Sequence, residues 1–90
     1  MRPDAEIRTA ISQLRENRKV CAPYNYFGES NYSSIDIMIS VLEKKMTERE
    51  VYDKYDSDTH ENRRKWRAAI TAVQYMRGEW ELQDILFPNQ

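Results

Sequence analysis

Four acidic residues near the middle of the chain could in principle bind a divalent cation: Asp53, Asp56, Asp58 and Glu61. A calcium-binding loop needs acids at alternating positions around an obligatory glycine that makes its sharp turn. The chain has two glycines, and neither lies in or beside this segment. We therefore interpret the four acids as helix-capping and solvated charges, and we predict no metal site.

The chain has one cysteine, Cys21, and one histidine, His60, which together with an acid could act as nucleophile, base and orienting group. Neither residue is surrounded by the local signature of a cysteine-enzyme family. The pair cannot supply the several nitrogen or sulfur ligands of a zinc site, and a lone cysteine forms no internal disulfide. We predict that the protein is not an enzyme, uses no cofactor and works in the reducing cytoplasm.

Cations are concentrated in one stretch of the C-terminal half, where no acid occurs between Asn62 and Gly78. This basic block consists of Arg63, Arg64, Lys65, Arg67 and Arg77. On a helix with about 100° per residue, the arginines follow one flank of the apolar stripe that includes Trp66, whereas Lys65 points away. Arg63, Arg64 and Arg67 are therefore the first candidate binding surface.

A second basic edge follows one flank of the first predicted helix, at Arg8, Arg15 and Lys19. If the two edges are neighbours in the fold, they form one patch that can hold phosphates or an acidic protein surface. The alternative is that each edge pairs with acids of the third helix or of the C-terminal tail. The sequence leaves both readings open.

The segment at 20–33 is long for a loop in a compact domain, and it is rich in aromatic residues. Such a loop must either be packed down or be functional. Tyr24, Tyr26 and Phe27 are anchors of the kind that dominate binding energy at protein interfaces. We name this segment the aromatic loop, and these three residues are the second candidate binding surface.

Composition and periodicity predict helices for the rest of the chain. Apolar residues make up 40% and charged residues 32%, which is typical of a globular domain, and only two glycines are present for tight turns. We predict a single all-α domain over 1–90, a compact orthogonal bundle of four main helices plus a short C-terminal helix. The predicted helices span 3–19, 34–46, 47–56, 59–77 and 80–87. No apolar run or leader indicates a membrane span or a signal peptide.

Capping signals set most of the predicted boundaries. Ser33 or Ser34 can cap the second helix, Thr47 with Glu50 forms a capping box, and Gly78 suits a helix end. Asp58 or Thr59 can cap the fourth helix. The second helix is apolar on two sides, so we expect it to be central.

Several large side chains are expected in the core. The third helix should bury Val51, Tyr52 and Tyr55, and the fourth should bury Trp66. The tail carries Trp80, Leu82, Leu86 and Phe87, which is too much apolar surface to stay solvated, so we expect it to dock. Trp66, Val73, Trp80 and Phe87 recur every seven residues, and we interpret this seam as core. The oligomeric state is left open.

One resemblance concerns the segment from Met46 to Pro88. Its Met46-Thr47-Glu48 helix start, its Arg67-Ala68-Ala69-Ile70 helix and its closing Asp84-Ile85-Leu86-Phe87-Pro88 resemble short helical accessory proteins of phages and prophages. The resemblance implies noncatalytic binding to a host or phage macromolecule. It assigns no role to any single residue.

Two functional hypotheses follow. We favour a small noncatalytic binding protein or inhibitor that acts through protein–protein contacts, because the net charge is −1 and the charge is segregated. The alternative is a helix-turn-helix regulator, in which the third helix braces the fourth and the arginines meet nucleic acid. The pI of about 5.8 and the acids of the turn, Asp56 and Asp58, argue against the alternative.

Overall fold

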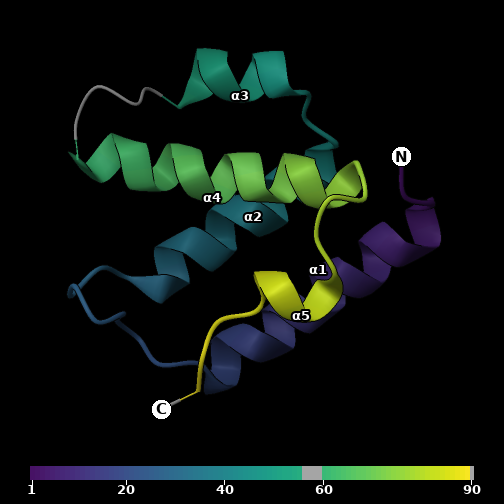
Figure 1. Ribbon diagram of the computed structural model, residues 1–90. Coiled ribbons are helices and arrows are strands. Elements are labelled where there is room, and N and C mark those ends of the chain that lie inside the picture. The colour runs from purple at the N-terminus through teal and green to yellow at the C-terminus, as the bar shows by residue number, and fades with distance from the viewer. Residues whose placement is uncertain (56–59, 90) are drawn as a thin grey trace.

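The computed structural model describes residues 1–55 and 60–89, with only the backbone described for 60–62. It contains the helices α1 (Asp4–Val20), α2 (Asn31–Lys44), α3 (Glu48–Lys54), α4 (His60–Met76) and α5 (Leu82–Ile85), as Figure 1 shows. The described ranges contain no strand. The predicted all-α bundle is confirmed. None of the described helices is long and apolar enough to cross a membrane.

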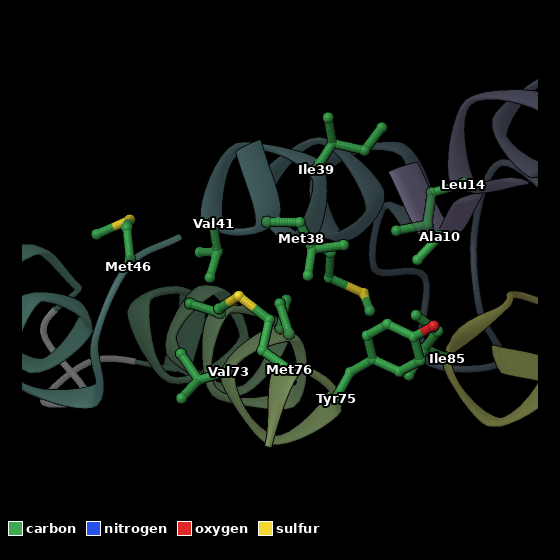
Figure 2. Close-up of a cluster of buried hydrophobic side chains, with 14 of the residues drawn as sticks. Ala10, Leu14, Met38, Ile39, Val41, Met46, Val73, Tyr75, Met76 and Ile85 are labelled. Atoms are coloured by element: carbon green, nitrogen blue, oxygen red, sulfur yellow. The ribbon is translucent and has the colours of Figure 1, made fainter. Parts of the chain in front are cut away.

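Helix α2 lies at the centre of the bundle, as predicted. It packs against α1 on one side and α4 on the other, while α3 and α5 contact α4. Figure 2 shows Met38 and Val41 of α2 above Val73 and Met76 of α4, with Ala10 and Leu14 of α1 to the right. The largest fully buried apolar side chains are Ile7, Leu14, Ile35, Met38, Val41, Leu42, Val51 and Met76. A helix with two apolar faces can bury both only between two neighbours.

Two predicted boundary signals are confirmed. The Thr47 hydroxyl accepts the Glu50 backbone N–H at the start of α3. The Glu50 carboxylate accepts the Thr47 backbone N–H, which completes the capping box. Gly78 ends α4 with φ of +88°. The amides of Gly78 and Glu79 donate to the carbonyl oxygens of Tyr75 and Gln74, the pattern of a Schellman cap, which needs a left-handed residue at the glycine position.

The start of α2 was predicted wrongly. The helix begins at Asn31 rather than 34, and its cap is Ser30, whose hydroxyl accepts the Ser33 amide, rather than Ser33 or Ser34. Asn31 is buried and donates from Nδ2 to the Ala22 carbonyl at 2.9 Å. This tertiary bond fixes the first turn, so the aromatic loop ends at residue 30 instead of 33.

Three helix ends also differ from the prediction. Helix α2 stops at Lys44 rather than 46 because Lys45 takes a left-handed conformation, φ 49°, and the Met46 amide turns back to the Val41 carbonyl. Helix α3 stops at Lys54 rather than 56, since Tyr55 is extended. Helix α5 spans Leu82–Ile85 rather than 80–87. The predicted caps Asp58 and Thr59 lie outside the described residues.

The aromatic residues around α3 are less buried than predicted. Val51 is fully buried, but Tyr52 is 55% exposed and Tyr55 is half-buried. Trp66 is also half-buried rather than largely buried, with its ring centroid 5.7 Å from that of Tyr52. Its Nε1 is buried without a hydrogen-bond partner among the described residues. Because α3 is short, it covers only part of this face of α4.

The C-terminal tail docks, as predicted. Ile85 is buried, and Leu82, Leu86 and Phe87 pack against the core, whereas Trp80 is 41% exposed. The side-chain amide of Asn17 bonds to both backbone groups of Phe87, accepting from its N–H at 2.9 Å and donating to its carbonyl at 3.1 Å. The tail therefore returns to the end of α1 (Figure 1).

Candidate binding groove

The aromatic loop is held in a defined shape by Asn25. The Asn25 Oδ1 accepts hydrogen bonds from the backbone N–H groups of Phe27 and Glu29, both at 2.9 Å. The backbone N–H of Asn25 in turn donates to the Glu29 carbonyl. Gly28 turns the chain with φ of +77°. Tyr24 and Ser30 form an isolated bridge at the base of the loop. These local bonds order the loop tip although its aromatic side chains are exposed.

The tip presents two aromatic rings to solvent. Tyr26 is 93% exposed and Phe27 is 80% exposed, and their rings meet edge to face with centroids 5.4 Å apart. Tyr24 is 60% exposed. Large apolar side chains held in place but uncovered are unusual on a monomer and mark interaction sites when they gather in one patch.

Arg64 ties the loop to α4. Its guanidinium donates from Nη1 to Glu29 Oε1 at 3.3 Å, and from Nη2 to the Ser30 carbonyl at 3.4 Å and to Asn31 Oδ1 at 3.3 Å. The Arg64 and Glu29 side chains are 25% and 22% exposed, so the pair is partly shielded from water. The planar fork of an arginine suits three acceptors from one segment. Arg64 therefore has a structural role, whereas the sequence predicted it only as a binding residue.

A groove of about 630 Å³ opens beside this contact, and we call it the α4 groove. Its walls come from α4, α2, the aromatic loop and the tail. The lining residues are Phe27, Glu29, Ser34, Met38, Arg63, Arg64, Arg67, Ala68, Thr71, Asp84, Ile85, Leu86 and Phe87. The structure thus brings all three candidate arginines together with Phe27, while Tyr24 and Tyr26 do not line the groove.

Arg63 and Arg67 differ from the other arginines of the basic block. Both are exposed, and neither side chain makes an ion pair or hydrogen bond with any residue that the structure describes. Arg77, by contrast, pairs with Glu48 at 3.3 Å and with Glu79 at 2.8 Å. The unpaired positive charge of the block is therefore located on the rim of the α4 groove.

The basic edge of α1 does not extend this surface. Arg15 pairs with Glu43 of α2 at 3.3 Å, and Lys19 pairs with Glu16 at 3.0 Å. Arg15, Lys19 and Glu43 line a separate hollow of about 670 Å³ between α1 and α2. Two of the three cations of the α1 edge are therefore paired within the fold, but with acids of α1 and α2 rather than with the predicted acids of α3 or the tail, and Arg8 makes no ion pair among the described residues.

Asp4 and Tyr75, both outside the groove, have shifted pKa values. The Lys45 ammonium donates to Asp4 Oδ1 at 2.7 Å and lowers the pKa of that exposed carboxyl. Burial raises the pKa of the Tyr75 hydroxyl, against the opposing effect of the Arg2 guanidinium over its ring at 4.2 Å. Arg2 also bonds to the Tyr75 and Trp80 carbonyls, which ties the N-terminal segment to the turn before α5.

The residues considered for catalysis or metal binding do not meet in the described ranges. Cys21 is buried, and Sγ lies 3.9 Å from the Arg18 carbonyl, so the thiol is shielded. Asp53 is exposed and lies 4.0 Å from Arg49. Asp56, Asp58 and the side chains of His60 and Glu61 lie outside the described residues. Within the described part of the chain, no three His, Cys, Asp or Glu side chains are grouped to hold a metal.

Sequence reasoning missed the second wall of the groove. Asp84, Leu86 and Phe87 face the arginines from the tail, yet they were expected only to dock. The apolar crowding of the tail was the available signal, but it does not say which surface stays accessible after docking. Comparisons with protein-family models, with curated proteins and with solved structures found no match for this chain.

Proposed function

We propose that this protein is a noncatalytic binding protein that holds a protein partner at the α4 groove and the adjoining tip of the aromatic loop. The observation that carries the proposal is the meeting of Phe27 with Arg63 and Arg67, which pair with none of the described residues, on one concave surface. Arginine and aromatic side chains are the types that most often dominate interface energies. An ordered loop also lowers the entropy lost when its anchors are immobilised.

The chemistry of the groove favours an acidic and partly apolar partner. Its floor is formed by apolar side chains of α2, α4 and the tail, such as Met38, Ala68 and Ile85. Two guanidinium groups at the rim offer donors but no acceptors, and charge-assisted bonds to carboxylates are the strong class of hydrogen bond. A partner with carboxylates beside apolar side chains would complement both features.

The nucleic-acid alternative has less support. Figure 1 shows α3 running back alongside α4, whereas helix-turn-helix pairs cross at a steep angle of about 90–120°. The second half of α4 is mostly buried, including Ala69 and Val73, which limits how far it can enter a DNA groove. Two unpaired arginines neutralise few phosphates, while a DNA-binding surface commonly contacts about 6–10.

The resemblance of residues 46–88 to phage accessory proteins suggests a biological setting for such binding. A small protein of this kind would act as an inhibitor or regulator by occupying a surface of a host or phage protein. The α4 groove and the loop tip supply a compact surface for that purpose.

A pull-down from the native host tests the proposal. The tagged full chain is compared with Phe27→Ala and with Arg8→Glu, since Arg8 on α1 is exposed and makes no ion pair among the described residues. We expect a protein that is retained with or without added nuclease, is kept by Arg8→Glu and is lost by Phe27→Ala. Retention that disappears with nuclease, or that survives Phe27→Ala unchanged, would overturn the proposal.

A further inference from the structure

Apart from Arg63 and Arg67, the polar side chains along the α4 groove are already engaged within the fold. The Thr71 hydroxyl donates to the Arg67 carbonyl at 2.8 Å, and the Ser34 hydroxyl contacts the Ser30 carbonyl at 3.5 Å. The part of the chain that the structure describes also offers no strand edge. An extended peptide in this groove would find few partners for its backbone N–H and C=O groups, which are costly to bury unpaired. A helix carries its own backbone hydrogen bonds and avoids that cost.

The long wall of the groove is itself a helical ridge. Arg63, Arg67 and Thr71 follow one another at intervals of four residues along α4 and all line the groove. Residues four apart on a helix have their Cβ atoms about 5–6 Å apart. Such a ridge packs into the furrow of a second helix at an interaxial distance of about 8–10 Å. The Cβ spacing of Arg63 and Arg67 therefore matches that of two acidic residues one turn apart on a partner helix.

The opposite wall restricts where the partner can carry its acids. Asp84 lies there and accepts the Glu81 amide through Oδ2, so its carboxylate is fixed in position at the start of α5. Glu29 lies at the loop end and is already paired with Arg64. Acids on the flank of the partner that faces Asp84 would be repelled, whereas acids facing Arg63 and Arg67 would be attracted.

From these three features we propose that the occupant of the α4 groove is an amphipathic acidic helix of a protein partner. It would place carboxylates one turn apart against Arg63 and Arg67, and lay its apolar stripe on Phe27, Leu86 and Phe87. The inference rests on the proposed function and adds the conformation and the charge pattern of the bound segment. A neutral apolar helix would leave both guanidinium groups without partners and would bind more weakly.

The test uses three labelled peptides of about 14 residues in an alanine-rich background, a length at which isolated helices begin to form. The first carries two Leu-Glu pairs one turn apart, the second has glutamine in place of both glutamates, and the third has a central proline. Fluorescence anisotropy gives the affinity, and amide chemical-shift changes in the ¹⁵N-labelled full chain locate the site. We expect the first peptide to shift residues of the α4 groove, and to bind at least about tenfold more tightly than the other two.

Charge reversal on the protein completes the test. Arg63→Glu with Arg67→Glu should weaken the first peptide by at least about tenfold and should favour a version with lysine in place of glutamate. The control is Arg8→Glu with Arg49→Glu, which changes the net charge equally on exposed positions of α1 and α3 and should leave the affinity unchanged.

Equal binding of the proline peptide would overturn the helical conformation, and equal binding of the glutamine peptide would overturn the charge pattern. If no peptide binds while the pull-down still yields a partner that depends on Phe27, the acidic-helix inference is wrong and the proposed function stands. If the pull-down instead yields only nuclease-sensitive retention, the proposed function itself fails.

Discussion

Replacing Arg64 with alanine should loosen the aromatic loop, and the structure allows the cost to be worked out. The substitution removes three hydrogen bonds of 3.3–3.4 Å to Glu29, Ser30 and Asn31. It leaves the Asn31 side chain, which is 2% exposed, without the guanidinium donor to its Oδ1. A buried acceptor that loses its partner costs about 1–3 kcal/mol, whereas the pair with Glu29 is partly solvated and adds less. We expect a total loss of about 2 kcal/mol of unfolding free energy.

Thermal unfolding followed by circular dichroism measures this loss. For a domain of this size, each kcal/mol lowers Tm by about 4–8 °C, so Arg64→Ala should unfold about 8–16 °C below the parent protein. Arg67→Ala is the matched control, because Arg67 lies three positions further on the same helix and lacks any ion-pair partner in the described ranges. It should cost under about 0.5 kcal/mol. Equal melting temperatures for the two variants would refute the assignment of Arg64 as the tie between loop and helix.

Three further predictions concern the core, the tail and pH. Trp66→Ala should lower the unfolding free energy by about 3 kcal/mol, at the low end for a large aromatic because the ring is half-buried. Trp66→Phe should lower it by under about 1 kcal/mol, because it also removes the Nε1–H that has no partner among the described residues. Urea unfolding measures both losses. Asn17→Ala removes both bonds to Phe87 and should lower the unfolding free energy by about 1–3 kcal/mol. Amide hydrogen exchange should rise selectively at Phe87, a change that a general loss of packing would not produce. Asp4→Asn should lower Tm slightly at neutral pH. The difference from the parent should shrink as the pH falls below the ordinary aspartate pKa of about 3.9, because a carboxyl with a lowered pKa stabilises the fold only while it is ionised. A difference that does not shrink in acid would contradict the Lys45 contact.

The parts of the fold that were predictable depend on residues close together in the sequence. Thr47 and Glu50 form their capping box within four positions, and Gly78 supplies the left-handed residue where α4 ends. The start of α2 was not predictable in the same way. Ser30, Ser33 and Ser34 are equivalent as local caps, and the choice among them depends on the bond from Asn31 to Ala22, which only the tertiary fold provides.

The candidate site was predictable as a set of residues but not as a surface. The helical periodicity identified Arg63, Arg64 and Arg67 as one cationic flank, but nothing in the local sequence distinguishes the paired arginine from the exposed ones. Arg64 differs because Glu29 meets it from 35 positions away in the sequence. The same long-range packing placed Phe27 in the groove, and left Tyr26 beside it at the tip. Periodicity assigns a side chain to a face, whereas the neighbour across that face is set by how the helices pack.

The affinity of the captured partner for four purified proteins tests the central claim most directly. These are the parent chain, Arg63→Glu with Arg67→Glu, Phe27→Ala, and the control with Arg8→Glu and Arg49→Glu. If the groove and the loop tip are one binding surface, the arginine reversals and Phe27→Ala should each weaken binding by at least about tenfold, or 1.4 kcal/mol, with Tm within a few degrees of the parent. The control should bind as the parent does. Unchanged affinity after both groove reversals, with Phe27→Ala abolishing binding, would show that the arginines are only a solvated face and that the loop alone is the site.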